Sequence, residues 1–300
     1  MSCKNCLARP VFTTLNHEKL CKNCFIKYFE KKVYKTITKH KMIEYGEKIG
    51  VGLSGGKDSV TTLYLLQKFF EEKGNKIVAI AIDEGIHGYR GKTLEEAQAF
   101  CKEHGIPLTI TSYKKEFGFT LDEYLKKNNV NPCGVCGVLR RNLLNKAARR
   151  LKVDKLATGH NLDDEAQSIL MNQIKGNIGL SAKLGPVTGV LMHEKFIPRI
   201  KPLYFMTEKE TTIYSKMKEF HVSYNECPNF GDNFREVVGH VLNELEARLP
   251  GTKQGIINSF LDILPDLRKH YKSKRIGVCK ECGEPAAKNI CRVCEMLKKK

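Results

Sequence analysis

The sequence lacks any apolar run of the ~18 or more uncharged residues that a membrane-spanning helix needs. Its first residues, Met1 to Cys6, contain no apolar stretch of the signal-peptide type. We therefore expect a cytoplasmic protein with no membrane partner. Acidic residues are also scarce: 33 Asp and Glu stand against 51 Lys and Arg, which gives a net charge of +18. An excess of this size favours a large polyanion as partner.

Apolar residues and cysteines, by contrast, are abundant. The chain has 300 residues, of which 41% are hydrophobic and 28% charged, so it can bury a core and is neither a disordered linker, a collagen nor a coiled coil. Twelve cysteines are present. In a reducing compartment, paired cysteines are more often metal ligands or redox groups than disulfides.

The middle of the chain alternates short β-branched runs with amphipathic helical patterns, which is typical of βα units around a parallel sheet. Ile77 to Ile82 are apolar throughout, as expected for a strand buried on both faces. The pattern predicts strands at 48–53, 77–82, 108–112 and 155–158, with helices from the end of the first turn to Phe70 and at 93–104, 137–151 and 163–175. Helices alone are predicted afterwards, at 208–220, 233–248 and 254–263. The fold class is therefore α/β, with a helical extension.

These patterns divide the chain into five expected segments. They are a zinc module at 1–30, a basic linker or helix at 31–46, an α/β nucleotide-binding domain at 47–205, a helical extension carrying Cys227 at 206–272, and a second zinc module at 273–300.

Each end of the chain carries two CxxC pairs, separated by fourteen residues at the amino end and by eight at the carboxyl end. Four thiolates in two such pairs form a closed tetrahedral site, and a closed zinc site is structural rather than catalytic. The ion stabilises a module too small to fold on its own core. We therefore expect two structural Zn²⁺ ions, one on Cys3, Cys6, Cys21 and Cys24 and one on Cys279, Cys282, Cys291 and Cys294.

A turn with two adjacent glycines joins the first predicted strand to its helix. This geometry points backbone N–H groups and a helix N-terminus at a phosphate, although an ordinary glycine turn has the same outline. Between Gly52 and the pair Gly56-Lys57 there is one residue fewer than in the motif G-x-x-x-x-G-K-[ST]. Asp58 also stands where that motif has its hydroxyl residue. The segment instead resembles the PP-loop of the ATP pyrophosphatase superfamily, whose members cleave ATP between the α and β phosphates and place AMP on a carbonyl oxygen. The resemblance implies that ATP is bound by Ser54, Gly55, Gly56, Lys57, Asp58 and Ser59.

The ends of the other predicted strands also favour a nucleotide site, because ligands of open parallel sheets bind outside the carboxyl ends of the strands. Ala81 lies at one such end, and residues 157–164 lie at another. The second segment resembles a signature of the tRNA-modifying branch of that superfamily. The resemblance implies that Gly159 approaches the nucleotide, and that Asp163 or Asp164 holds Mg²⁺ or accepts a proton. The same acids suit the start of a helix, and both roles can coexist.

Three further cysteines lie between the ends. Cys133 and Cys136 form a pair, and Cys227 is the nearest additional candidate. Three cysteines can hold three irons of a [4Fe-4S] cube and leave the fourth iron open to an exogenous sulfur. Two alternatives stay open: Cys136 and Cys227 as a persulfide relay resolved through a disulfide, or a structural zinc with Cys101 as fourth ligand. Cys101, however, falls inside a helical pattern typical of a small buried apolar residue.

Taken together, these motifs resemble the TtuA family of tRNA 2-thiouridine synthetases in its archaeal form, over essentially the whole chain. The resemblance implies that ATP adenylates the C2 oxygen of a tRNA uridine and that sulfur then replaces it. It also implies an iron–sulfur cluster, [4Fe-4S] or [3Fe-4S], on Cys133, Cys136 and Cys227. Arg140 stands where some bacterial-type members have Lys, and it can bind phosphate but cannot act as a base. Its neighbourhood, with Arg141, is more similar to the branch that modifies the wobble uridine, with the T-loop uridine as second choice.

The family resemblance further implies partners. These are tRNA, a sulfur donor that is either sulfide or a ubiquitin-like carrier with a C-terminal thiocarboxylate, and a second subunit in a homodimer or a heterodimer. Two other functions are compatible with parts of the sequence. Amidation or lysidine-type chemistry on another carbonyl would use the same loop but leave the central cysteines unexplained. A zinc-stabilised RNA-binding protein with a degenerate nucleotide loop would have no catalytic activity.

Overall fold

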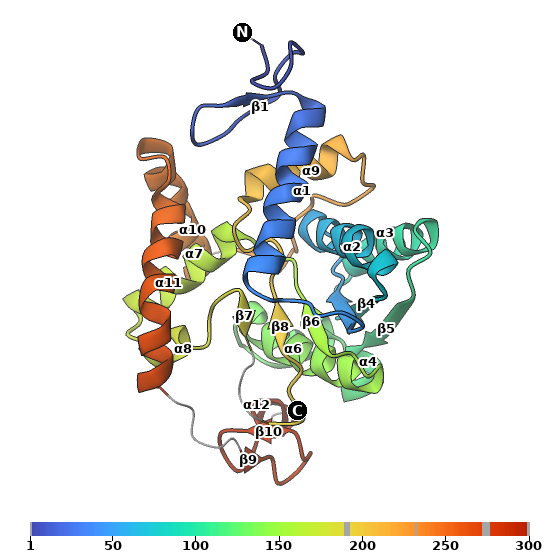
Figure 1. Ribbon diagram of the computed structural model, residues 1–300. Coiled ribbons are helices and arrows are strands. Elements are labelled where there is room, and N and C mark those ends of the chain that lie inside the picture. Colours follow the sequence, from blue (N-terminus) through green and yellow to red (C-terminus); the bar gives the residue numbers. More distant parts are fainter. Residues whose placement is uncertain (1, 189–192, 232, 272–276, 299–300) are drawn as a thin grey trace.

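A six-stranded sheet lies at the centre of the computed structural model, which describes residues 2–188, 193–231, 233–271 and 277–298 (Figure 1). The strand order is β5-β4-β3-β6-β8-β7, and all neighbours run parallel except β7 and β8. The strands are β3 (Lys48–Gly52), β4 (Lys76–Asp83), β5 (Leu108–Ser112), β6 (Lys155–Ala157), β7 (Val187–Thr188) and β8 (Arg199–Ile200). The four predicted strands are present. The two-residue strands β7 and β8 were not predicted, because so short a segment carries no periodicity.

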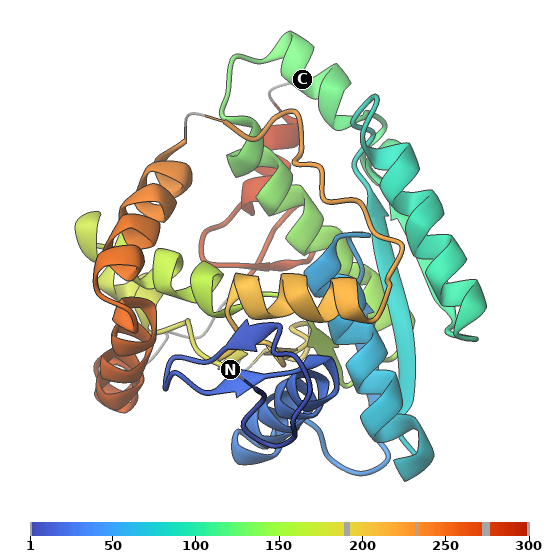
Figure 2. The same ribbon diagram turned by 90° about the horizontal axis from the view of Figure 1, so that it is seen from above.

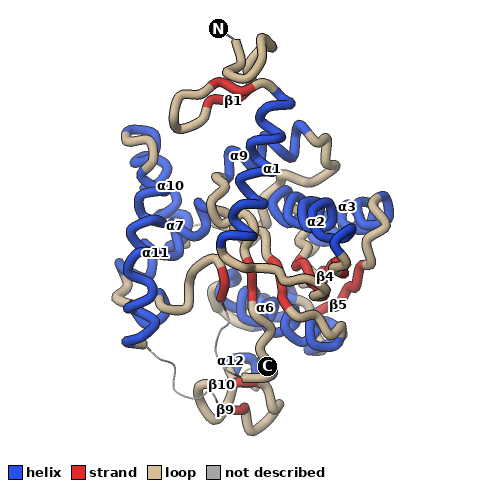
Figure 3. The backbone as a smooth tube through the Cα atoms, in the orientation of Figure 1, coloured by secondary structure: helices blue, strands red, loops and turns tan. Residues whose placement is uncertain are grey.

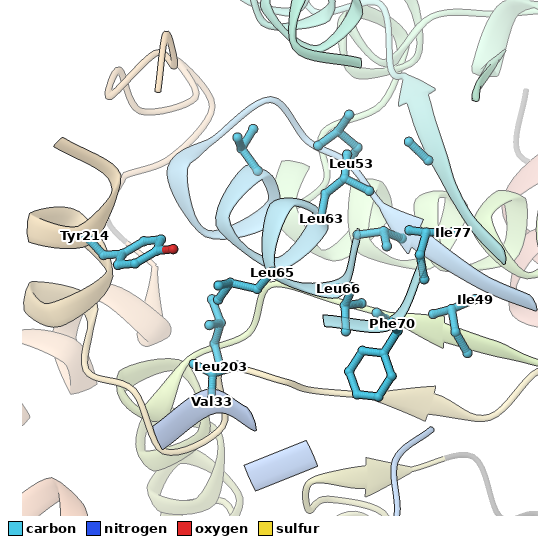
Figure 4. Close-up of a cluster of buried hydrophobic side chains, with 14 of the residues drawn as sticks. Val33, Ile49, Leu53, Leu63, Leu65, Leu66, Phe70, Ile77, Leu203 and Tyr214 are labelled. Carbon is cyan, nitrogen blue, oxygen red and sulfur yellow. The ribbon is translucent and has the colours of Figure 1, made fainter. Parts of the chain in front are cut away.

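Helices cover both faces of the sheet, as the α/β prediction requires. Side chains of β4 alternate between two cores: Ala79 packs in the first, and Ile80 packs in the second. The first core is formed with α1 (Lys22–Lys39), α2 (Lys57–Phe70), α3 (Arg90–Glu103) and α9 (Glu208–Met217), and Figure 4 shows part of it. The second is formed with α4 (Tyr113–Phe117), α5 (Leu121–Lys127) and α6 (Pro132–Arg150). A short 3₁₀ helix, Glu71–Lys73, follows α2.

A third core lies beside the sheet, where α10 (Phe234–Arg248) and α11 (Thr252–His270) pack on α7 (Leu162–Ile174). Figure 2 shows this pair on the flank opposite α3. The short helix α8 (Ile178–Ser181) follows α7. The predicted helical extension is thus divided, because α9 packs on α1 and α2 whereas α10 and α11 pack on α7. Helix α11 also continues beyond the predicted end at Ile263, through Pro265, because Leu264 beyond that end is buried in the third core.

The two cysteine-rich modules lie at opposite ends of the molecule (Figure 3). The first contains a hairpin of β1 (Phe12–Thr13) and β2 (Lys19–Leu20) and runs directly into α1, whose N-cap is Cys21. The expected boundary at residue 30 therefore falls inside one continuous helix. The second module contains β9 (Gly277–Val278), β10 (Pro285–Ala286) and α12 (Arg292–Leu297), which packs on α6. The expected boundary between 272 and 273 lies outside the described residues.

Among the helices that the structure describes, none combines the length and the apolar character required to cross a bilayer.

Candidate nucleotide and cluster site

A cavity of about 520 Å³ opens at the carboxyl ends of β3, β4 and β6. Six of the residues predicted for catalysis or nucleotide binding line it, from α2, α6, α7 and the segments after β3 and β6: Ser54, Asp58, Ser59, Arg140, Gly159 and Asp164. Ala81 is fully buried, and its neighbours Ile80 and Ile82 line the cavity in its place, because successive side chains of a strand point to opposite faces. The edge of the sheet predicted to bind ligand is thus hollow.

The turn before α2 needs a glycine at its first glycine position, because no other residue fits the backbone conformation there. Gly55 has φ of +88°, and a Cβ on it would overlap the carbonyl oxygen of Thr93 in α3. Gly159, after β6, is packed equally tightly: a Cβ there would lie 2.8 Å from the backbone carbon of Asp58. The two predicted nucleotide-binding segments are therefore in direct contact through their backbones.

The start of α2 is free to bind an anion. Its N-cap is Gly56, and no side chain caps the first N–H groups of the helix. The hydroxyls of Ser54 and Ser59 lie 3.0 Å apart and hold the turn closed. Lys57 lies beside this end of the helix, 3.0 Å from a carboxylate oxygen of Asp58 and 3.0 Å from one of Glu208. The arrangement can accept a phosphate through backbone donors and one ammonium group.

The two neighbouring acids at the start of α7 have different environments. Asp164 lines the cavity, caps its own helix with Asn161, and forms an ion pair of 2.7 Å with Arg235 from α10. Burial opposes its ionisation, but His160 and Arg235 outweigh that effect and lower the pKa of Asp164. Asp163 is not part of the cavity lining, since its two carboxylate oxygens contact Lys253 and the backbone N–H of Glu208. Only Asp164 is therefore open to a ligand.

Two more titratable groups of the cavity have shifted pKa values. Desolvation in the cavity lowers the pKa of His160 to about 4, with Lys201, Arg235 and Arg140 adding to the shift and Asp164 opposing it, although the side chain keeps solvent-exposed surface. The imidazole is therefore neutral near pH 7. Burial raises the pKa of Asp58, although Lys57 opposes the shift. The side-chain amide of Asn161 donates to Asp58 at 3.2 Å.

The central cysteines come from two segments. Helix α6 begins at Pro132, earlier than the predicted residue 137, so Cys133 and Cys136 lie in its first turns rather than in a separate loop. Cys227 lies between α9 and α10, and the thiol of Cys133 contacts the carbonyl oxygen of Asn229 in that segment at 3.7 Å. Burial raises the pKa of both Cys136 and Cys227. The Cys227 thiolate adds to the shift at Cys136, the Cys133 thiolate adds to the shift at Cys227, and Arg140 opposes both. The fold therefore brings the three predicted cluster ligands to one region.

Arg140 links this region to the cavity. It lies one helical turn after Cys136, lines the cavity, and is 3.7 Å from Glu84. Glu84 is buried and also pairs with Arg90 at 2.8 Å. Glu84, Arg90 and Arg235 were not predicted as site residues, because they come from separate elements and belong to no local motif.

The positions of the cysteine sulfur atoms show which cysteines could bind one zinc ion. In each terminal quartet the four sulfur atoms lie within 4.8 Å of one another, as the ligands of one tetrahedral zinc must. Within the described ranges no other group of metal-ligating side chains is as compact. The three central cysteines do not form so compact a group. In an iron–sulfur cluster each cysteine binds a different iron. Cys101 is buried in the first core, away from Cys136, which packs against the second, and so is not placed as a fourth ligand.

Comparison with known proteins adds to this geometry. Residues 26–238 match the PP-loop domain family. The chain is 38% identical to the tRNA-5-methyluridine(54) 2-sulfurtransferase of Pyrococcus horikoshii over 98% of this chain and 93% of that protein. It is 36% identical to the cytoplasmic tRNA 2-thiolation protein 1 of Xenopus laevis, over 93% of this chain and 81% of that protein. It superposes with a TM-score of 0.85, at 35% identity, on the U34-tRNA thiolase NcsA from Methanococcus maripaludis with its [4Fe-4S] cluster, covering 99% of this chain and 96% of the other.

Proposed function

We propose that this chain, which belongs to the PP-loop domain family and within it to the tRNA 2-thiolation enzymes, replaces the C2 oxygen of a tRNA uridine by sulfur in a reaction that uses ATP. One observation carries the proposal: Arg140, one turn after Cys136, shares a cavity with Ser54 of the PP-loop and with Gly159. A nucleotide bound at the loop and a sulfur delivered near the cysteines would therefore meet at the same substrate atom.

The first step is adenylation. The uridine O2 attacks the α-phosphorus of ATP, the bond to the β-phosphate oxygen breaks, and pyrophosphate leaves. The N-terminus of α2 and Lys57 bind the departing phosphates, and Arg140 stabilises charge that develops on the α-phosphate. The uridine N3 proton passes to a base in the cavity. Asp164, ionised beside Arg235, serves as that acceptor or as the ligand of Mg²⁺, and Asp163 is not available for either role.

The second step replaces the activated oxygen. A sulfur nucleophile attacks C2, the C2–O bond breaks, and AMP leaves with the original oxygen. The three cysteines Cys133, Cys136 and Cys227 suit a [4Fe-4S] cluster, which when bound supplies an iron with an open position for an exogenous sulfur. Arg140 and neutral His160 line the path between this region and the nucleotide.

The remaining assignments follow from the same proposal. The terminal quartets each hold a structural Zn²⁺, in agreement with their compact sulfur positions. The sulfur donor is sulfide or a thiocarboxylated ubiquitin-like carrier, the protein works as a dimer in the cytoplasm, and the wobble uridine is its target. Arg140 and the likeness to the U34 thiolase favour that target, and the likeness to the enzyme that acts on uridine 54 makes the T-loop the second candidate.

The test is nucleoside mass spectrometry with loop mapping. Unmodified tRNA is incubated without oxygen with reconstituted protein, ATP, Mg²⁺ and sulfide. Appearance of 2-thiouridine supports the proposal, and the loop that carries it identifies the target. If tRNA binds but neither pyrophosphate nor a thionucleoside appears with an intact cluster and either donor, the protein is an RNA-binding protein and the proposal is wrong.

A further inference from the structure

The charges that line the cavity do not balance. Four of its basic side chains have carboxylate partners: Arg90 and Arg140 pair with Glu84, Lys201 pairs with Glu165 at 2.7 Å, and Arg235 pairs with Asp164. The remaining acid of the lining, Asp58, pairs with Lys57. Three cations of the same cavity, Arg141, Lys183 and Arg199, form no ion pair with any residue that the structure describes. The cavity therefore has a surplus of positive charge in one part.

Arg199 occupies an unusual position for a charged side chain. It lies on β8, opposite Leu156 of β6, and Leu156 belongs to the apolar core beneath α6. The next residue, Ile200, packs in the core on the other face of the sheet. Because strand residues alternate, Arg199 projects toward α6, on the same face of the sheet as Leu156. Burial, with a contribution from Arg141, lowers the pKa of Arg199 to about 10.

Arg141 reaches the same region from α6. Its guanidinium folds back along the helix over Gly137, where an added Cβ would lie 3.2 Å from its Nη1 atom. Gly137 thus leaves the space that Arg141 occupies. Lys183, which follows α8, is exposed at the rim of the cavity. Three separate elements, α6, β8 and the segment after α8, therefore each contribute a positively charged side chain to the cavity lining. Figure 1 shows where these elements lie beside the sheet.

Of these three cations, Arg199 is partly buried and has no counter-charge among the described residues, which costs free energy, and a ligand of opposite charge would remove that cost. The phosphates of ATP already have donors at the start of α2, which follows β3. Strand β8 lies two positions from β3 in the sheet, a separation of about 10 Å at the usual strand spacing. The cations near β8 are therefore free to bind a second anion beyond the nucleotide.

We propose that Arg141 and Arg199, with Lys183 at the rim, bind a backbone phosphate of the tRNA beside the uridine that is modified. The inference rests on the proposed function. Guanidinium groups match the geometry of phosphate oxygens through paired N–H donors. An enzyme that works on a base must take it out of the stack, and a fixed flanking phosphate holds the extruded nucleotide over the cavity. The contact carries no sequence information and serves for positioning.

The experiment compares Arg199→Gln, Arg199→Lys and Arg141→Gln with Lys102→Gln, which removes one charge from an exposed residue of α3 outside the cavity. The dissociation constants for tRNA and for ATP are measured separately over a range of salt concentrations. We expect Arg199→Gln and Arg141→Gln to weaken tRNA binding roughly tenfold and to reduce its salt slope by about one unit. ATP binding stays within twofold, Arg199→Lys recovers part of the loss, and Lys102→Gln changes little.

A modified substrate then locates the phosphate. A single neutral methylphosphonate is placed in turn at each linkage flanking the target uridine. One of these should weaken binding to the wild type but have no further effect on Arg199→Gln or Arg141→Gln, because both changes remove the same contact. Independent losses at every linkage would overturn the inference, as would a loss of ATP affinity with tRNA affinity unchanged. Both results are read on a wild type that thiolates tRNA, so they leave the proposed function standing. Arg141 is partly exposed, so its variant tests the inference even if the Arg199 variants fold poorly.

Discussion

Gly56 and Ser223 are joined by an isolated parallel β-bridge. The first is the N-cap of α2 in the PP-loop, and the second lies four residues before Cys227. Glu96 of α3 fixes the same point, because its carboxylate accepts the backbone N–H of Ser223 at 2.7 Å. The nucleotide loop and the segment with the third central cysteine are therefore physically connected, and α3 supports both.

Glu96→Ala should slow thiolation without weakening ATP binding. The change removes the acceptor of the Ser223 N–H, and a hydrogen bond to a charged group contributes roughly 1.5–3 kcal/mol. We expect about a tenfold fall in kcat, measured as thionucleoside formed under saturating ATP and tRNA. Glu95→Ala, one residue earlier on the same helix and with no hydrogen bond to this segment, is the control. An unchanged kcat in Glu96→Ala would mean that the connection has no role in the reaction.

Gly55→Ala should unfold far more readily than the wild type. Its φ of +88° is strained for alanine, and the new Cβ would overlap the carbonyl oxygen of Thr93. We expect a loss of more than about 2 kcal/mol in the free energy of unfolding, measured by urea denaturation. Gly91→Ala is the matched control, since it lies in α3 with no atom near its added Cβ, and it should be neutral or stabilising. Equal stability of the two variants would contradict the geometry of the turn.

His160 should make the folded protein less stable in mild acid. Its pKa is about 4 in the folded state, because desolvation in the cavity and the nearby cations Lys201, Arg235 and Arg140 disfavour its charged form, against roughly 6.5 when unfolded. Between these values the unfolded chain binds a proton that the folded protein does not, so the free energy of unfolding falls as pH drops from about 6.5 to 4. His160→Gln should lose this part of the pH dependence, measured by urea denaturation at several pH values. His221→Gln, which removes a histidine that does not line this cavity, is the matched control.

Zinc content should follow the two terminal quartets separately. The sulfur atoms of each quartet lie close enough for one ion, so elemental analysis should find two zinc ions per chain. Cys6→Ser and Cys282→Ser should each lose one of them, and Cys101→Ala should lose none, because Cys101 is buried in the core. Both changed cysteines are exposed, which limits direct damage to packing. Retention of both ions in either quartet variant would refute the assignment of that site.

The strands that could be predicted were those with a continuous apolar run or β-branched content, such as 77–82. Strands β7 and β8 could not be, because each is two residues long and is held by pairing with residues remote in the sequence. The start of α6 was predicted five residues late, since Gly134 and Gly137 weaken the helical pattern. Asn131 as N-cap with Pro132 in the first turn was the available signal.

The residues of the candidate site likewise fall into those that the sequence predicts and those that it does not. The PP-loop and the segment after β6 are contiguous, so their residue types identify them. Glu84 follows β4, Arg199 lies in β8 and Arg235 lies in α10, and all three line the cavity. None of them belongs to a local sequence motif. Their roles depend on which side chains lack a partner, and only the folded arrangement determines that. Asp163 and Asp164 illustrate the limit, because these two adjacent acids have different partners: Lys253 and the Glu208 N–H for Asp163, and Arg235 for Asp164.

Cys21 is at once a member of the first sulfur quartet and the N-cap of α1. Phe25, four residues later, is fully buried, so the first turn of the helix is part of the core. If this quartet holds the proposed zinc, an oxidant that releases the ion would free that turn and expose aromatic surface to solvent. Oxidation at the edge of the molecule would then partly unfold the core, and chaperones and proteases would recognise the exposed surface. The lifetime of the enzyme in the cell would therefore shorten as exposure to oxidants increased.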